Sequence, residues 1–109
     1  MLKLQVIMDE VKIRREKIYS AEKIYKAIDG VFVDDYGFVK GKDGFYYERG
    51  QKDDYANFWT GILLLKDQDW FMDNVKVWLW FNSDDSDDPE DFAVEDIRAH
   101  YLAKRKKSA

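Results

Sequence analysis

His100 is the only histidine of this chain, and it lies four residues after Asp96. On a helix this spacing places a carboxylate one turn from an imidazole, where it could orient the ring for general acid–base catalysis. The pair falls at the edge of an apolar stripe, however, and a half-buried histidine bonded to a neighbouring acid is the commoner outcome. We therefore predict no catalytic residue from this pair.

A run of acidic residues after position 83 could bind a cation. Six of the eight residues from Asp84 to Asp91 are acidic. If Asp84 opened a twelve-residue calcium loop, Glu95 would occupy the last position, which belongs to a bidentate glutamate. The sixth position needs glycine, however, and here it is Pro89, whose φ is fixed at a negative value. We expect a solvated turn that caps a helix, and we predict no metal site.

The same carboxylates have a second possible use as a mimic of nucleic acid. Closely spaced acids can imitate a phosphate array and occupy the basic groove of a nuclease or of a DNA- or RNA-binding protein. The array would need further acids on the same face, and the candidates are Asp34, Asp35, Asp53, Asp54, Asp67, Asp69 and Asp73. Because acid runs are usually just solvated, a nucleic-acid-mimicking inhibitor is our alternative and not our main hypothesis.

The composition limits the chemistry further. The chain has no cysteine, which excludes disulfides, thiolate catalysis and cysteine-bound zinc. One histidine cannot build a histidine-rich metal centre, and no phosphate-binding or nucleophile motif is present. We therefore predict a protein that has no cofactor and is not an enzyme. The second alternative, an enzyme or a small-ligand domain, requires a deep pocket with convergent polar groups and a perturbed titratable residue.

The charge balance bears on partners and location. With 22 acidic and 18 basic residues the formal net charge is −4, which weakly repels nucleic acid and anionic lipid. No segment approaches the roughly 18 apolar residues of a membrane helix, and residues 1–8 do not have the pattern of a secretory signal. We expect a cytoplasmic protein that binds a protein partner or a second copy of itself, and neither nucleic acid nor a membrane.

Hydrophobic periodicity predicts a strand and then a helix in the first third of the chain. Apolar residues alternate with polar ones over residues 2–8, which is typical of a strand. Residues 9–18 fit either a continuation of that strand or a helix. Ser20 is a candidate N-cap for an amphipathic helix over about 20–35. Gly37 would end it in the left-handed conformation.

The rest of the chain predicts more strands and a second helix. Residues 38–40 and 45–48 form a hairpin around a glycine-containing loop. Residues 57–65 and 75–81 are predicted strands. A helix is predicted over about 88–105, with a proline in its first turn and one of the two preceding aspartates as its cap.

These elements together predict an α+β fold. It consists of a mostly antiparallel four- to five-stranded sheet and the two amphipathic helices. The length of 109 residues predicts a single domain, 1–109. Residues 103–109 are predicted to form a frayed basic tail of that domain.

The strands predicted at 57–65 and 75–81 are apolar on both faces, although an antiparallel sheet with one solvated face alternates between apolar and polar residues. Three explanations are open. The protein's own helices and loops cover both faces. The tryptophan-bearing face contacts a partner or a second copy. The same face binds a small ligand or stacks the bases of single-stranded nucleic acid, and the surrounding acids disfavour the nucleic acid.

We adopt the second explanation as the hypothesis. The chain is then a small acidic protein-interaction module that uses an aromatic sheet face with an acidic rim. The predicted contact residues are Trp59, Trp70, Phe71, Met72, Trp78, Trp80, Asp84, Asp85, Asp87 and Asp88.

Overall fold

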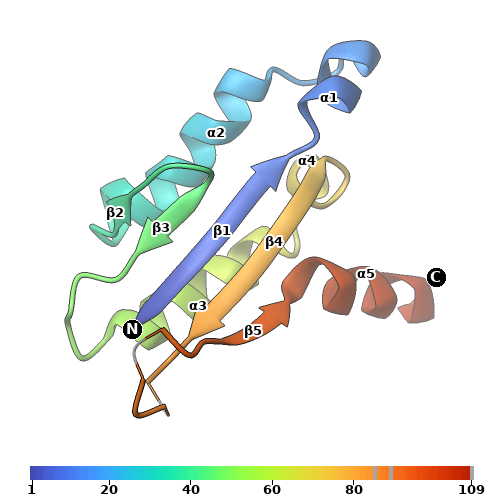
Figure 1. Cartoon of the computed structure of the whole chain (residues 1–109). Helices are drawn as coiled ribbons and strands as arrows, with labels where there is room; N and C mark the ends of the chain where they lie inside the picture. The colour runs from blue at the N-terminus through green and yellow to red at the C-terminus, as the bar shows by residue number, and fades with distance from the viewer. Residues whose placement is uncertain (85, 89, 109) are drawn as a thin grey trace.

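The computed structural model describes residues 1–84, 86–88 and 90–108. Within these residues the fold is built on a five-stranded antiparallel sheet with the strand order β2-β3-β1-β4-β5 (Figure 1). The predicted α+β class and the mostly antiparallel sheet are confirmed. The strands are β1 (Leu2–Met8), β2 (Val39–Lys40), β3 (Phe45–Tyr47), β4 (Val75–Asn82) and β5 (Ala93–Asp96).

Helical segments connect the strands and pack on one side of the sheet. Figure 1 shows α3 and α4 passing behind β1 and β4. The connectivity places β1 and β3 together at the centre with β2 and β4 outside them, which is the split β-α-β order. β5 and α5 follow as an addition. The helices are α1 (Glu10–Glu16), α2 (Ala21–Asp29), the π-helical η1 (Gly30–Asp35), α3 (Asp54–Leu65), α4 (Asp69–Met72) and α5 (Ile97–Ser108). A helix with the length and hydropathy of a membrane span is absent from the described residues.

The helix predicted over about 20–35 is confirmed as α2 followed directly by η1. Ser20 is its N-cap, and the Ser20 hydroxyl accepts a hydrogen bond from the Lys23 backbone N–H at 3.4 Å. Gly37 has a φ of +74°, so the predicted left-handed stop is also confirmed. The apolar stripe buries Ile24, Ile28 and Phe32, and this burial fixes which side of the helix faces the sheet.

The strand predicted over 57–65 is wrong, because these residues form most of α3. Nearly every residue from 58 to 65 is apolar, so strand and helix periods cannot be distinguished there. The residues that α3 buries are Asp54, Phe58, Gly61, Ile62 and Leu65, which is a helical spacing. The helix packs closely on η1 at Gly61, since a Cβ there would lie 2.5 Å from the Phe32 ring.

The helix predicted over 88–105 begins later than expected. Residues 93–96 instead form β5, which pairs antiparallel with β4. α5 starts at Ile97, and the Asp96 carboxylate accepts the Ala99 backbone N–H at 3.0 Å, so Asp96 takes the capping role assigned to the aspartates at 87 and 88. Pro89 lies outside the described residues. The helix continues through residues 103–108, where a frayed tail was predicted.

The hydrophobic core lies between the sheet and α2, η1, α3 and α4. Burial in β1 alternates strictly, with Leu2, Leu4, Val6 and Met8 facing the helices. The Phe38 and Phe58 rings stack there with centroids 3.7 Å apart. Side chains of this size each stabilise the fold by about 1.5–3 kcal/mol when fully buried. The other buried apolar residues include Ile24, Ile28, Phe32, Tyr46, Ile62, Phe71, Trp78 and Trp80.

Candidate functional site

The tryptophan face of β4 is the covered face of the sheet. Trp78 is 0% exposed and Trp80 is 4% exposed. Phe71 and Met72, which were also predicted to contact a partner, are 0% and 4% exposed. The assumption that this face is exposed is therefore wrong, and these four side chains belong to the core.

Two further tryptophans lie at the edge of that core. Trp59 is half-buried on α3, and its ring contacts Trp80 edge-on with centroids 5.8 Å apart. Trp70 is half-buried on α4, and its indole N–H donates to the Gln68 side-chain oxygen at 3.2 Å. The structure thus does not gather the predicted tryptophans into one outward-facing surface.

The opposite face of the sheet is uncovered, and we call it the open face. The strand register places Tyr47, Lys3, Phe81 and Val94 in one row across β3, β1, β4 and β5, with Val39 of β2 at its end. Val39 and Val94 are 57% and 56% exposed, and the other three are half-buried. Half-buried side chains also fill the neighbouring rows, namely Phe45, Gln5 and Leu79, and then Ile7 and Val77. No helix in the described part of the chain covers this face (Figure 1).

A cation lies at the centre of the aromatic residues on the open face. The Lys3 ammonium nitrogen is 5.0 Å from the centroid of the Phe45 ring, 5.1 Å from that of Phe81 and 4.4 Å from that of Phe92. The Phe81 and Phe92 rings meet edge to face at 6.0 Å. Contacts of this kind each contribute about 0.5–1 kcal/mol at exposed sites. They also hold the rings in a fixed arrangement.

Acidic residues border the open face on the β4–β5 side. Because Phe92 packs on Lys3, the loop that precedes β5 reaches this face. Asp87 and Asp88 of that loop are exposed, and so is Asp96 of β5. Together with Asp84 they form what we call the acidic rim. Asp85, which was predicted to belong to it, lies outside the described residues.

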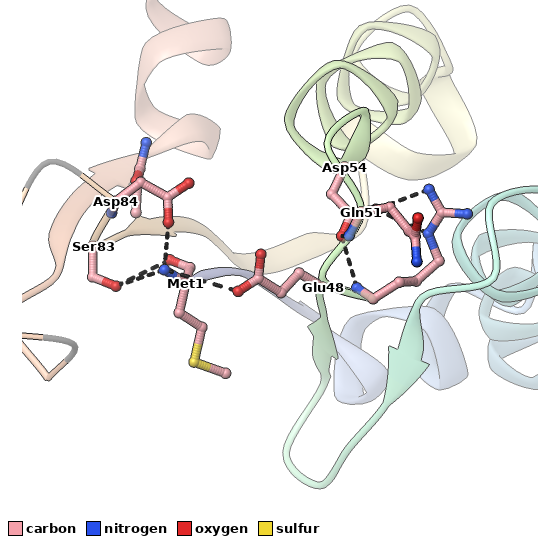
Figure 2. A network of polar contacts seen from close by, with 8 residues as sticks. Met1, Glu48, Gln51, Asp54, Ser83 and Asp84 are labelled. Atoms are coloured by element: carbon pink, nitrogen blue, oxygen red, sulfur yellow. Dashed lines mark hydrogen bonds and ion pairs between the residues drawn. The ribbon is translucent and has the colours of Figure 1, made fainter.

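A polar network holds the start of the acidic loop to the first strand (Figure 2). The Met1 amino group donates to the Ser83 hydroxyl at 2.9 Å and also contacts the Asp84 carboxylate. Glu48 lies 3.8 Å from the same amino group. The Ser83 backbone N–H donates to the Met1 carbonyl at 3.0 Å. This end of the sheet is therefore fixed by paired groups, while Asp87 and Asp88 stay exposed.

Figure 2 also shows the buried carboxylate of Asp54 at the start of α3. It is 1% exposed and accepts backbone N–H groups of Arg49 at 2.8 Å and of Gln51 at 3.0 Å. The Arg49 guanidinium lies 2.8 Å away. Burial alone would raise the pKa of Asp54, but the hydrogen bonds and the guanidinium outweigh it and lower the pKa below its ordinary value. Asp54 therefore has a structural role and closes the loop before α3.

A cavity of about 750 Å³ lies between the β2–β3 hairpin, α2 and the end of β1. At this cavity the Tyr46 hydroxyl donates to one Asp29 oxygen at 2.5 Å, and the Lys40 ammonium donates to the other at 2.6 Å. The Tyr25 hydroxyl accepts the Met8 backbone N–H at 3.2 Å. Burial, and then the hydrogen bond and charge of Asp29, raise the pKa of Tyr46 well above its ordinary value. The convergent polar groups required for a ligand site are thus present here.

The remaining sequence candidates do not combine into a site. His100 is exposed on α5 with its ring against Tyr101, and its predicted partner Asp96 is used as the cap of α5. Among the described residues, no group of three or more His, Cys, Asp or Glu side chains could hold a metal ion.

The acids proposed for nucleic-acid mimicry are spread along the molecule. Asp67 and Asp69 precede β4 and Asp84 follows it, so the eight residues of the strand, about 25 Å, separate them. Asp67 pairs with Lys66 at 2.8 Å, and Asp69 pairs with Arg105 at 3.2 Å. This arrangement does not favour a continuous array of carboxylates.

Comparison with known proteins adds no functional information. Neither a protein-family model nor a curated protein matches this chain.

Proposed function

We propose that this protein is an interaction module that binds a basic protein partner through its open sheet face. The observation that carries the proposal is the row of Val39, Tyr47, Lys3, Phe81 and Val94, which crosses all five strands with no helix over it in the described residues. Contiguous apolar surface of this kind on a small protein is typical of an interface. Aromatic side chains at the centre and charged ones at the rim are the usual anatomy of such a surface.

The charges favour a basic partner. The acidic rim, with Asp84, Asp87, Asp88 and Asp96, would meet lysine or arginine side chains around an apolar centre. Complementary charge at a rim accelerates association and selects the partner more than it adds affinity. Nucleic acid is disfavoured on the same ground, because its phosphates would meet these carboxylates.

A second copy of the chain is the weaker choice for this face. Stacking two open faces would bring two acidic rims to the perimeter of one interface, and like charges there destabilise a complex. Pairing through the β5 edge is disfavoured as well, because it would bring the acidic residues Glu95 and Asp96 of both copies into one short strand pair. Self-association is therefore an outcome that contradicts the proposal.

The test is affinity capture from the native host with three baits. Val94→Lys places a cation on the exposed end of the row and changes no buried contact, since Val94 is 56% exposed. The matched control is Leu64→Lys on α3, because Leu64 is 50% exposed on the helical side of the molecule. The proposal predicts a basic protein that wild type and Leu64→Lys retain and Val94→Lys loses.

Salt supplies the second criterion for the same captured protein. The captured protein should be released from the bait at about 0.5 M sodium chloride, because exposed charges more than a few ångströms apart are screened at that concentration. Equal capture by all three baits would contradict the proposal. So would a wild-type protein that sediments as a dimer and captures only itself.

A further inference from the structure

The cavity between the hairpin and α2 shares Ile7 with the open face, and its size is that of a ligand site. Its volume of about 750 Å³ lies within the range of about 300–1,000 Å³ that is typical of small-molecule pockets. Val6 and Ile7 of β1 line it on one side, and Tyr25 of α2 lines it on another. Ile7 and Tyr25 are half-buried and offer an apolar surface to the body of a ligand, whereas the Val6 side chain is 2% exposed and faces the core.

The shape of the cavity depends on a hairpin that is held tightly against β1. The Val6 backbone N–H donates to the Gly44 carbonyl at 2.9 Å. Gly44 has a φ of +79°, and a Cβ there would lie 2.2 Å from the Val6 carbonyl oxygen. Only glycine therefore permits this approach. The hairpin wall of the cavity is therefore held in close contact with β1.

Within the cavity one set of charges is already neutralised. Asp29 accepts both the Tyr46 hydroxyl and the Lys40 ammonium, so its two carboxylate oxygens are occupied. This cluster is pre-organised, because Tyr46 is 3% exposed and cannot reorient freely. It supplies a polar inner wall without a net charge.

A second set of charges at the cavity is unpaired. Glu22 and Lys26 are four residues apart on α2, yet they form no ion pair with each other. Within the described part of the chain, Asp43 of the hairpin forms no ion pair either. All three line the cavity. One ammonium and two carboxylates thus lie at the exposed margin of the cavity.

We propose that this cavity binds a small zwitterion of the amino-acid type with an apolar side chain. The ligand carboxylate pairs with Lys26, and the ligand ammonium pairs with Glu22 or Asp43. Its side chain packs on Ile7 and Tyr25. A pure amine can pair only with a carboxylate and a pure acid only with Lys26. A ligand that carries both charges makes one ion pair more than either, and this is what the site selects.

The test uses three probes that share one apolar body and differ only in charge. They are L-phenylalanine, phenethylamine and 3-phenylpropionate, and a second set consists of L-leucine, isopentylamine and 4-methylpentanoate. Each is titrated into the ¹⁵N-labelled full chain up to about 10 mM, which detects the weak affinities of such small ligands. The proposal predicts shifts of the Val6, Gly41 and Gly44 amides, with the zwitterion at least about fivefold tighter than either analogue in one of the two sets.

Variants assign the charge recognition. Lys26→Met should weaken binding of the zwitterion at least about fivefold and abolish its preference over the amine. Lys23→Met on the same helix is the matched control, since Lys23 does not line this cavity. Four results would each overturn the proposal: absence of shifts with both zwitterions, shifts confined to other regions, an amine or acid that binds as tightly as its zwitterion in both probe sets, or equal behaviour of the two variants.

Discussion

The Lys3 ammonium lies 4.4 Å from the centroid of the Phe92 ring, although the two residues stand at opposite ends of the chain. This contact joins the first strand to the loop before β5. It also places that loop beside the open face. The contact between Lys3 and Phe92 therefore helps to place Asp87 and Asp88 beside the open face, while the Met1 amino group holds Asp84.

Phe92→Ala should loosen this junction without unfolding the protein. The substitution removes the Lys3 contact and the edge-to-face contact with Phe81 at 6.0 Å. We expect the free energy of unfolding to fall by about 0.5–1.5 kcal/mol, as measured by urea denaturation. Amide hydrogen exchange in β5 should accelerate. Val11→Ala is the control, because Val11 is 71% exposed and should change stability by less than about 0.5 kcal/mol. Unchanged exchange in β5 would contradict the role given to Phe92.

Gly61→Ala and Gly30→Ala should change stability in opposite directions. A Cβ at Gly61 would lie 2.5 Å from the Phe32 ring, whereas a Cβ at Gly30 would meet nothing within 4 Å. Overpacking at Gly61 should cost about 1–3 kcal/mol. Gly30→Ala should stabilise by up to about 1 kcal/mol, because alanine is the better helix former. Thermal unfolding of both variants checks this, and a neutral Gly61→Ala would contradict the packing of α3 on η1.

The elements in which apolar residues recur at a clear helical or strand spacing could be predicted from sequence. Ser20 and Gly37 bound a stripe with clear helical spacing, and the hairpin had glycine at its turn. Residues 57–65 gave no period, because α3 is apolar on nearly all sides. β5 was hidden because only its pairing with β4 distinguishes residues 93–96 from the start of the helix that follows them.

The candidate site was predicted only in part, for the same reason. The apolar character of both faces of β4 was predicted correctly. The face with Trp78 and Trp80, however, was predicted to be exposed and is the buried one. The residues placed in a neighbouring strand belong to α3, and this helix covers Trp80 through Phe58 and Trp59. The cluster around Lys3 depends on contacts between β1, β3, β4 and the loop before β5. Local sequence patterns do not contain such long-range contacts.

Asp54→Asn should destabilise the protein in a pH-dependent manner. The buried carboxylate accepts two backbone N–H groups and the Arg49 side chain, so the substitution should cost about 1–3 kcal/mol at neutral pH. Because the pKa of Asp54 is lowered in the folded state, its contribution is complete above the unfolded pKa of about 3.9. It is lost as the pH falls through the folded pKa.

The measurement is urea denaturation of wild type and Asp54→Asn between neutral pH and about pH 2. The stability difference should stay constant down to about pH 4 and then narrow. Asp53→Asn is the control, since the Asp53 side chain is 64% exposed and its loss should cost less than about 1 kcal/mol. A difference between wild type and Asp54→Asn that does not vary with pH would contradict the assigned ionisation.

Tyr46→Phe should alter stability at alkaline pH. Because the pKa of Tyr46 is raised in the folded state, its contribution is complete below the unfolded pKa of about 10. Above that pH the unfolded chain loses the proton while the folded chain keeps it, so stability falls as the pH rises toward the folded pKa. Wild type should therefore lose stability between about pH 9 and 11.5 more steeply than Tyr46→Phe.

Urea unfolding at several alkaline pH values checks this expectation. Tyr47→Phe is the control, because Tyr47 lies on the open face and is only half-buried. It should follow the wild-type curve. A Tyr46→Phe curve parallel to wild type over this range would show that the Tyr46 hydroxyl ionises as freely in the folded protein as in the unfolded chain.

Photo-cross-linking in the native host tests the open-face interaction most directly. A benzophenone amino acid replaces Tyr47 on the open face in one variant and Leu64 on the helical side in the other. The proposal predicts that position 47 gives a covalent adduct with a basic protein and that position 64 does not. Adducts at position 64 alone, equal adducts at both positions, or an adduct at position 47 that contains only two copies of this chain would contradict it.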